Sequence, residues 1–295
     1  MTQEVSRGVT RVVTPRPVVE GAGVSLVRSI GTHELDHVDP FLLLDHFESA
    51  NPRDYEAGFP YHPHRGIETI TIIRKGEVRH GDSLGHAGSI GSGDIQWMTS
   101  GSGILHEEMP QVRPEGVGGL QIWLNLPARD KMTRPKYRDL RSDLLPETET
   151  DEGARIRVIA GEAMGGRLTG PVEGLTVSPK FVDVTLPEGA SFRETVPSGH
   201  AAFAYVDHGE VLFGPEKKPV RAPALVLFED GGLVEAVAGS GGGRFLLAAA
   251  RPLHEPIARY GPFVMNTRSE IEQTLRDLQT GRFIRNEPSD HVAPR

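Results

Sequence analysis

The segment between His62 and Glu108 places the tightest limit on what this chain can fold into. It contains short β-like runs separated by glycines, with eight glycines between residues 76 and 103. Glycine supplies the positive φ that tight turns need. Residues 69–73 and 94–98 alternate as half-buried strands do. The segment therefore predicts several short strands joined by tight turns, as in a small barrel.

The segment begins with His62 and His64 and ends with His106 and Glu108, two pairs of residues of types that can bind metals, each pair at a spacing of two. Residues i and i+2 of an extended chain point to the same face, so His62 lies beside His64, and His106 beside Glu108. If the two strands oppose each other in a barrel, three imidazoles and one carboxylate converge. A lone histidine on a strand is more often structural, but two pairs favour a metal site. We therefore predict His62, His64, His106 and Glu108 as metal ligands.

Most of the other nine histidines are expected to be structural. His80 and His86 are expected in turns between strands, in contact with solvent. His46 is the one further candidate for the site, as a residue of its pocket.

The proposed ligands limit the choice of metal. Three imidazoles and one carboxylate suit iron, nickel, copper, manganese or zinc better than calcium. Structural zinc usually has thiolate ligands, and the chain has no cysteine. An octahedral ion with four protein ligands keeps two positions open for water, substrate or dioxygen. Fe(II) is our first choice, and Ni(II), Mn(II), Cu(II) and Zn(II) remain alternatives.

Several motifs resemble those of the pirin family of the cupin superfamily. They lie at residues 39–45, 62–69, 93–99, 103–110 and 260–267, so the resemblance spans nearly the whole chain. It implies an all-β bicupin of two antiparallel, jelly-roll-like β-barrels with a short C-terminal helix. It further implies that the N-terminal barrel alone binds metal, usually iron, through the four ligands named above.

Two features depart from the general cupin pattern. Glu68 stands where many cupins have a metal-binding glutamate, but the pirin pattern takes its carboxylate from the second motif. We therefore expect a structural or supporting role for Glu68. The proline that is usual in the second motif is missing, and Thr99 and Gly101 stand in its region.

The resemblance also implies an activity, because pirins resemble quercetin 2,3-dioxygenases. These enzymes open the heterocyclic ring of a flavonol with O2 and release carbon monoxide. Glu108 would then be both ligand and catalytic base, accepting the proton of the flavonol 3-hydroxyl. The expected substrate contacts are Asp45, Phe47, Trp97, Met98 and Gln121. Two alternatives remain: an iron-dependent regulatory protein that binds a transcription factor or metabolic enzyme, and a cupin isomerase or storage protein.

The chain of 295 residues is long enough for two domains. We predict an N-terminal metal-binding cupin domain over residues 1–135 and a C-terminal degenerate cupin domain over residues 136–295. Residues 127–152 are rich in proline and charge and are expected to be a solvated linker. The second half repeats the short strands without a His-x-His pair, and residues 269–278 predict a helix capped by Thr267 or Ser269.

Composition argues against several classes of partner. The net charge of −8 opposes binding to a phosphate backbone. No apolar run reaches the length of a membrane helix, and the first residues lack an apolar signal segment. Together with the absence of cysteine, this predicts a cytoplasmic protein.

Overall fold

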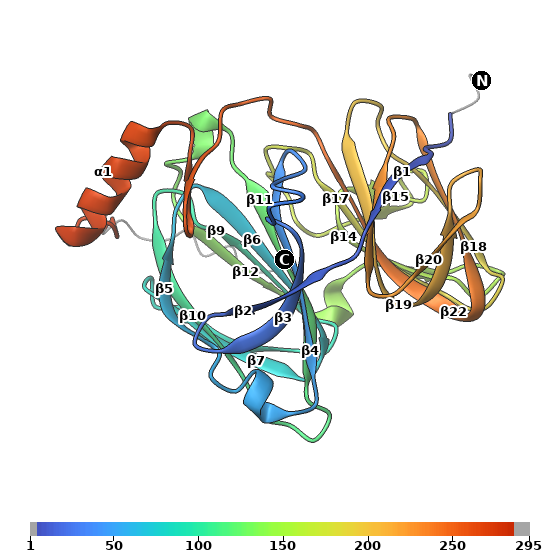
Figure 1. Ribbon diagram of the computed structural model, residues 1–295, viewed down its shortest axis with the longest axis horizontal. Helices are drawn as coiled ribbons and strands as arrows, with labels where there is room; N and C mark the ends of the chain where they lie inside the picture. The colour runs from blue at the N-terminus through green and yellow to red at the C-terminus, as the bar shows by residue number, and fades with distance from the viewer. Residues whose placement is uncertain (1–4, 286–295) are drawn as a thin grey trace. The chain divides into compact units, whose positions relative to one another are not determined.

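Antiparallel strands make up most of residues 5–285, which are the residues that this computed structural model describes (Figure 1). They form sheets of nine, seven and four strands and two small two-stranded ribbons. Within these residues there is one α-helix, α1 (Arg268–Gln279), near the C-terminal end. The predicted all-β class with a short C-terminal helix is confirmed.

The chain forms two compact units, and each takes one end of the chain from the other half of the sequence. The N-terminal unit consists of residues 16–143 and 253–285, and the C-terminal unit of residues 5–15 and 144–252. Strand β1 (Val9–Val13) pairs with β21 (Ala224–Phe228) of the C-terminal unit. Helix α1 packs with the N-terminal unit instead of the C-terminal domain in which the sequence placed it. The predicted single boundary after residue 135 does not match these units, because each unit includes a terminal segment from the other half of the sequence.

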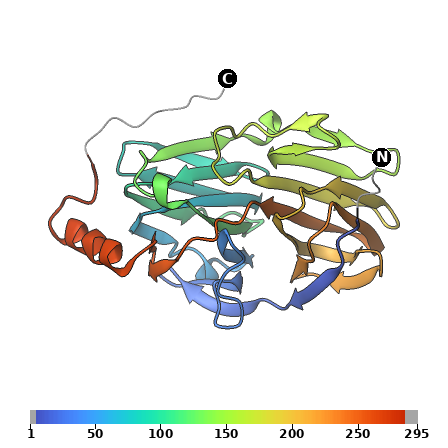
Figure 2. The ribbon, with the colours of Figure 1, turned by 90° about the horizontal axis from the view of Figure 1, so that it is seen from above.

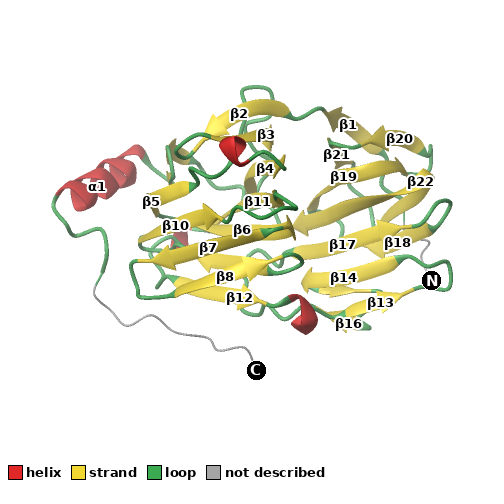
Figure 3. Ribbon diagram, turned by 90° about the horizontal axis from the view of Figure 1, so that it is seen from below, coloured by secondary structure: helices red, strands yellow, loops and turns green. Residues whose placement is uncertain are grey.

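Two sheets of the N-terminal unit carry the features of interest (Figure 3). The seven-stranded sheet has the order β12, β9, β6, β11, β4, β3, β2. The four-stranded sheet has the order β5, β10, β7, β8. Their bounds are β2 (Arg16–Glu20), β3 (Val24–Ile30), β4 (Phe41–Ser49), β5 (Phe59–His64), β6 (Ile67–Lys75), β7 (Glu77–Asp82), β8 (Ala87–Gly91), β9 (Ile95–Thr99), β10 (Ile104–Pro110), β11 (Val117–Asn125) and β12 (Lys136–Leu140).

The segment expected to be a solvated linker is instead largely part of the structure. Strand β12 pairs with β9, and β13 (Glu147–Glu149) pairs with β14 (Arg155–Ala160). Lys131, in the charged run, is 1% exposed and donates to the backbone oxygens of Gly66 and Val264 at 2.9 Å. The linker prediction is therefore wrong, because the prolines and charges of this segment occur between and within paired strands.

The C-terminal unit is built around one sheet of the order β1, β21, β19, β22, β17, β14, β13. Strand β18 pairs with β22 and β20 pairs with β19. The remaining bounds are β15 (Glu162–Ala163), β16 (Leu168–Thr169), β17 (Lys180–Leu186), β18 (Ser191–Thr195), β19 (Ala201–Phe213), β20 (Lys218–Arg221) and β22 (Leu233–Ala250). Phe192, Phe213 and Phe245 meet edge-to-face in its buried apolar core. The strands expected in the second half are present.

Helix α1 begins at a capping box, in which the Thr267 side chain accepts from the Glu270 amide and the Glu270 side chain accepts from the Thr267 amide. Ile271 and Thr274 form its buried face, whereas Leu278 is 37% exposed. The helix packs against β23 (Ala258–Tyr260) and β24 (Phe263–Met265), to one side of the sheets of its unit (Figure 2).

Candidate metal centre and cavity

Three histidines meet where β5 pairs with β10. His62 lies opposite His106 in the antiparallel register, and His64 lies opposite Ile104. The ring centroids are 4.4 Å apart for His62 and His106, 4.8 Å for His62 and His64, and 5.0 Å for His64 and His106. One ligand nitrogen from each ring lies within 4.8 Å of those of the other two. The structure thus brings together the three imidazoles selected from the sequence.

Strand β5 carries Pro63 between two of these histidines. Proline cannot donate a ladder hydrogen bond and is therefore confined to an edge strand, a strand start or a bulge. The four-stranded sheet indeed has β5 at its edge. Because β5 is an edge strand, the side of it that faces away from β10 has no neighbouring strand in this sheet.

The three rings have the chemistry of metal ligands. Burial lowers the pKa of His64 and of His106 well below the usual value, which keeps both imidazoles neutral. Both ring nitrogens of His106 and the Nδ1 of His64 are buried without a hydrogen-bond partner. Nδ1 of His62 lies 2.9 Å from the Pro60 carbonyl, which leaves its Nε2 lone pair available. One free ring nitrogen from each histidine, at this separation, fits a divalent metal ion.

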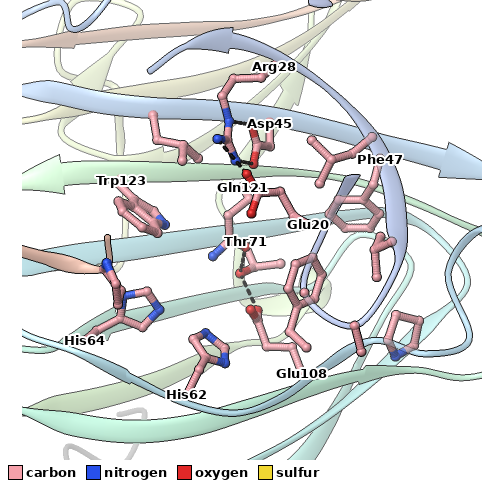
Figure 4. A pocket seen from close by; sticks show the side chains of 18 of the residues that line it. Glu20, Arg28, Asp45, Phe47, His62, His64, Thr71, Glu108, Gln121 and Trp123 are labelled. Atoms are coloured by element: carbon pink, nitrogen blue, oxygen red, sulfur yellow. Dashed lines mark hydrogen bonds and ion pairs between the residues drawn. The ribbon is translucent and has the colours of Figure 1, made fainter. Parts of the chain in front are cut away.

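Glu108 belongs to the same cavity but stands apart from the three-histidine group. A register shift separates it from His106 on β10, and it lies opposite Phe59. Its carboxylate is buried and accepts a hydrogen bond from Thr71 Oγ1 at 3.0 Å. Burial raises its pKa above the usual value. Figure 4 shows Glu108, His62 and His64 around one end of the cavity.

The cavity next to these side chains has a volume of about 600 Å³. This lies within the range of pockets that enclose drug-sized ligands. Its walls are largely apolar and are formed by residues from several strands, including Val24, Leu26, Leu43, Phe47, Tyr55, Phe59, Val78 and Trp123. A largely apolar ligand with a few polar groups therefore fits the lining.

The part of the cavity formed by β3, β4 and β11 is polar. Arg28 forms a two-bonded ion pair with Asp45, with both N–O distances at 2.7 Å, and contacts Glu20 at 2.8 Å. Gln121 lies opposite Asp45 in the register of β11 and β4. The guanidinium of Arg259 lies 5.0 Å from the ring centre of Trp123. Arg28, Arg259 and Thr71 were missed from the sequence, because nothing in their local patterns indicates a cavity.

The structure separates the predicted substrate contacts into two groups. Asp45, Phe47 and Gln121 line the cavity. Trp97 and Met98 do not line it; both lie on β9 with no exposed surface. The tryptophan of the cavity is Trp123, which the sequence could not distinguish from Trp97.

Other histidine and acidic residues behave differently from expectation. His46 is buried but does not line the cavity. His80 was expected in a solvated turn, but it is buried within β7, and its ring contacts the Tyr137 hydroxyl. Glu68 accepts a hydrogen bond from Thr99 Oγ1 at 2.7 Å outside the cavity lining, in line with a structural role.

Within residues 5–285, the three histidines are the one group of histidine and acidic side chains close enough to hold a metal. The same residues contain no helix that is both long and apolar enough to span a membrane.

Known proteins share both the sequence and the fold. Residues 23–124 match the Pirin family, and residues 181–284 match the Pirin C-terminal cupin domain. A Pseudomonas aeruginosa protein, provisionally named a quercetin 2,3-dioxygenase, is 43% identical over 279 residues, covering 93% of this chain and 97% of that one. Human pirin is 38% identical over 281 residues, covering 94% of each.

The structure of a quercetin 2,3-dioxygenase from Acinetobacter baumannii matches with a TM-score of 0.85 at 32% identity. The match covers 94% of this chain and 98% of that one. The two-barrel cupin fold expected from the motifs is thereby confirmed. With this fold, and with close relatives along nearly its whole length, the chain belongs to the pirin family.

Proposed function

We propose that this protein is a metal-dependent dioxygenase that cleaves a flavonol such as quercetin with O2. The observation that carries the proposal is the position of three imidazoles, each with a ring nitrogen free of hydrogen bonds, beside a largely apolar cavity of about 600 Å³. A metal with a purely structural role does not require a ligand-sized cavity beside it. The A. baumannii enzyme of the same fold is named for this reaction.

His62, His64, His106 and Glu108 would hold the metal, and Fe(II) is the ion we propose. Nickel, manganese, copper and zinc suit the same donors. When bound, the metal supplies a positive charge and open positions at which a flavonol oxygen and O2 can react.

Glu108 is the residue placed to move a proton. Its carboxylate faces the cavity, and burial raises its pKa, which makes it a better proton acceptor than an exposed carboxylate (Figure 4). We assign it the proton of the flavonol 3-hydroxyl. Phe47 and Trp123 would contact the flat rings and exclude water from the reacting atoms.

The test is anaerobic loading with Fe(II), then addition of quercetin and O2 with detection of carbon monoxide. We expect turnover by the wild type and its loss in His64→Ala, while Glu108→Gln retains folding and loses most activity. Wild-type protein that contains iron but releases no carbon monoxide would rule out the reaction. Normal turnover in both variants would rule out the residue assignments.

One observation favours a second function, that of a metal-dependent regulatory protein. Arg65 directly follows His64 and contacts Thr274 and Asp277 of α1. Occupation of the metal site could therefore change the surface that α1 presents to a partner. Hydrogen exchange of α1 amides, compared with and without Fe(II) and after oxidation to Fe(III), tests this function. Identical exchange rates of the α1 amides without metal, with Fe(II) and with Fe(III) would contradict the regulatory function.

A further inference from the structure

Thr71 is the polar side chain that connects Glu108 with the rest of the cavity. It lies on β6 directly opposite Gln121 of β11, and both residues line the cavity. Its Oγ1 is 3.0 Å from Oε1 of Glu108 and 2.6 Å from Oε1 of Gln121. Figure 4 shows these three side chains beside one another, between the histidines and the Arg28–Asp45 pair.

These two hydrogen bonds cannot both be donated by Thr71. A hydroxyl has one proton, whereas the carboxylate of Glu108 and the Oε1 of Gln121 are both acceptors. As a metal ligand, Glu108 is an ionised carboxylate and has no proton to give. The remaining solution is a half-turn of the Gln121 amide, which exchanges its oxygen and nitrogen. Nε2 then donates to Thr71 Oγ1, and Thr71 donates to Glu108.

This direction of the bonds determines what Gln121 presents to a ligand. Among the described residues, the contact with Thr71 is the one hydrogen bond of the Gln121 amide. When Nε2 donates to Thr71, Oε1 becomes the outer atom of the amide, and it is an acceptor. Asp45, directly opposite on β4, already accepts from Arg28 through both carboxylate oxygens, so Oε1 of Gln121 is the acceptor without a partner here. A ligand group that contacts this oxygen must be a hydrogen-bond donor.

We propose that Thr71 and Gln121 are a positioning pair: Thr71 fixes the Glu108 carboxylate, and Gln121 thereby selects aromatic ligands that carry a second hydroxyl group. The proposal rests on the proposed role of Glu108 as a metal ligand. It predicts that the cavity prefers polyhydroxylated flavonols over those with the 3-hydroxyl alone. When a ligand without a donor covers Oε1 of Gln121, this oxygen loses its hydrogen bond to water and gains no other, which is the source of the preference.

The first arm of the test measures metal affinity without any turnover. Metal-free protein is titrated with Co(II), followed by visible absorption. Thr71→Val removes the hydroxyl at constant shape, and we expect binding about tenfold weaker, with recovery in Thr71→Ser. Thr69→Val is the matched control, because Thr69 is on the same strand, equally buried, and its hydroxyl has no partner in the described residues. It should bind Co(II) as the wild type does. Equal affinity in Thr71→Val and Thr69→Val would overturn the positioning role.

The second arm measures ligand selection in the Fe(II)-loaded protein under anaerobic conditions. Dissociation constants are compared for quercetin and for 3-hydroxyflavone, which lacks the additional hydroxyls. We expect the wild type to favour quercetin by about tenfold, and Gln121→Leu to lose this preference while Co(II) affinity stays within about twofold. An unchanged preference in Gln121→Leu would overturn the selection role. Neither arm requires oxygen, so a wild type that binds quercetin without cleaving it would refute the dioxygenase reaction and leave this test intact.

Discussion

His62 and His106 lie directly opposite each other on β5 and β10, with ring centroids 4.4 Å apart. The register of one strand pair therefore creates the histidine cluster. A slip by one residue would turn a whole set of side chains to the other face. The site thus depends on the register of β5 and β10, which their ladder hydrogen bonds hold. Removing one histidine should weaken metal binding and leave the folding of the chain nearly unchanged.

We expect His106→Ala to fold normally and to bind Co(II) at least about a hundredfold more weakly than the wild type. Thermal unfolding provides a second readout, because a ligand that binds the folded state alone stabilises it by mass action. Co(II) should raise the unfolding temperature of the wild type and have no effect on His106→Ala. His46→Ala, which removes a buried histidine outside the cavity lining, is the control. Full Co(II) affinity in His106→Ala would refute the ligand assignment.

Stability of the metal-free protein should depend on pH through the same histidines. Burial lowers the pKa of His64 and His106, so below about pH 6.5 the unfolded chain binds more protons than the folded one. The free energy of unfolding should therefore rise with pH up to that value and fall on acidification. The raised pKa of Glu108 acts in the opposite direction above about pH 4.5, because the folded state then binds the extra proton. Urea unfolding across this window should show a flatter dependence in the variant carrying both His64→Gln and His106→Gln, and a steeper one in Glu108→Gln. A slope unchanged by the histidine substitutions would contradict the prediction.

Ligand binding should depend on the apolar wall independently of the metal. Leu43 is 2% exposed, lines the cavity and lies opposite Trp123 on the neighbouring strand. Leu43→Phe adds volume where a ring system would lie, so we expect quercetin to bind about tenfold more weakly. Co(II) affinity should stay within about twofold, because no ligand nitrogen moves. A parallel loss of both affinities would show that the substitution disturbs the fold and not the cavity alone.

The histidine cluster could be predicted because its signal is local. Two side chains at a spacing of two share a face in any strand, whatever the strand pairs with. Likewise, the α1 helix is recognisable from Thr267, Glu270 and the apolar spacing that follows. Motifs of this kind carry their geometry within a few residues.

The remaining contacts of the cavity depend on residues far apart in sequence. Trp97 and Trp123 both occupy alternating apolar runs, and only the partners of β9 and β11 decide which ring reaches the cavity. Arg28 meets Asp45 because β3 pairs with β4 in one register. No local pattern contains that information.

Lys131 shows the same limit for burial. Its surroundings in the sequence are charged, which indicates a solvated segment. In the structure its Nζ donates to the oxygens of Gly66, Asn125 and Val264, and Gly66 and Val264 lie 65 and 133 residues away in the sequence. Gly66 has a φ of +81°, and a side chain there would approach the Val264 oxygen to 2.0 Å. The close packing that permits a buried lysine therefore also requires a glycine.

Arg65 offers a test of how the C-terminal helix is attached to the strands that carry the three histidines. Its guanidinium donates to the Ser102 oxygen at 2.7 Å and to Asp277 at 2.8 Å, and lies 4.6 Å from the Phe283 ring centre. Arg65→Lys keeps the charge but loses the forked donor geometry, so we expect the free energy of unfolding to fall by about 3 kcal/mol.

The amides of α1 in Arg65→Lys should exchange faster than in the wild type, as measured by hydrogen exchange. Arg276→Lys is the matched control, because Arg276 is exposed and its side chain bonds to Gln273 of the same helix. It should leave stability within about 0.5 kcal/mol of the wild type. If α1 exchanges at the wild-type rate in Arg65→Lys, the other contacts of the helix are sufficient to hold it. In that case the link from His64 to α1 is too weak to support a metal-dependent change at the helix surface.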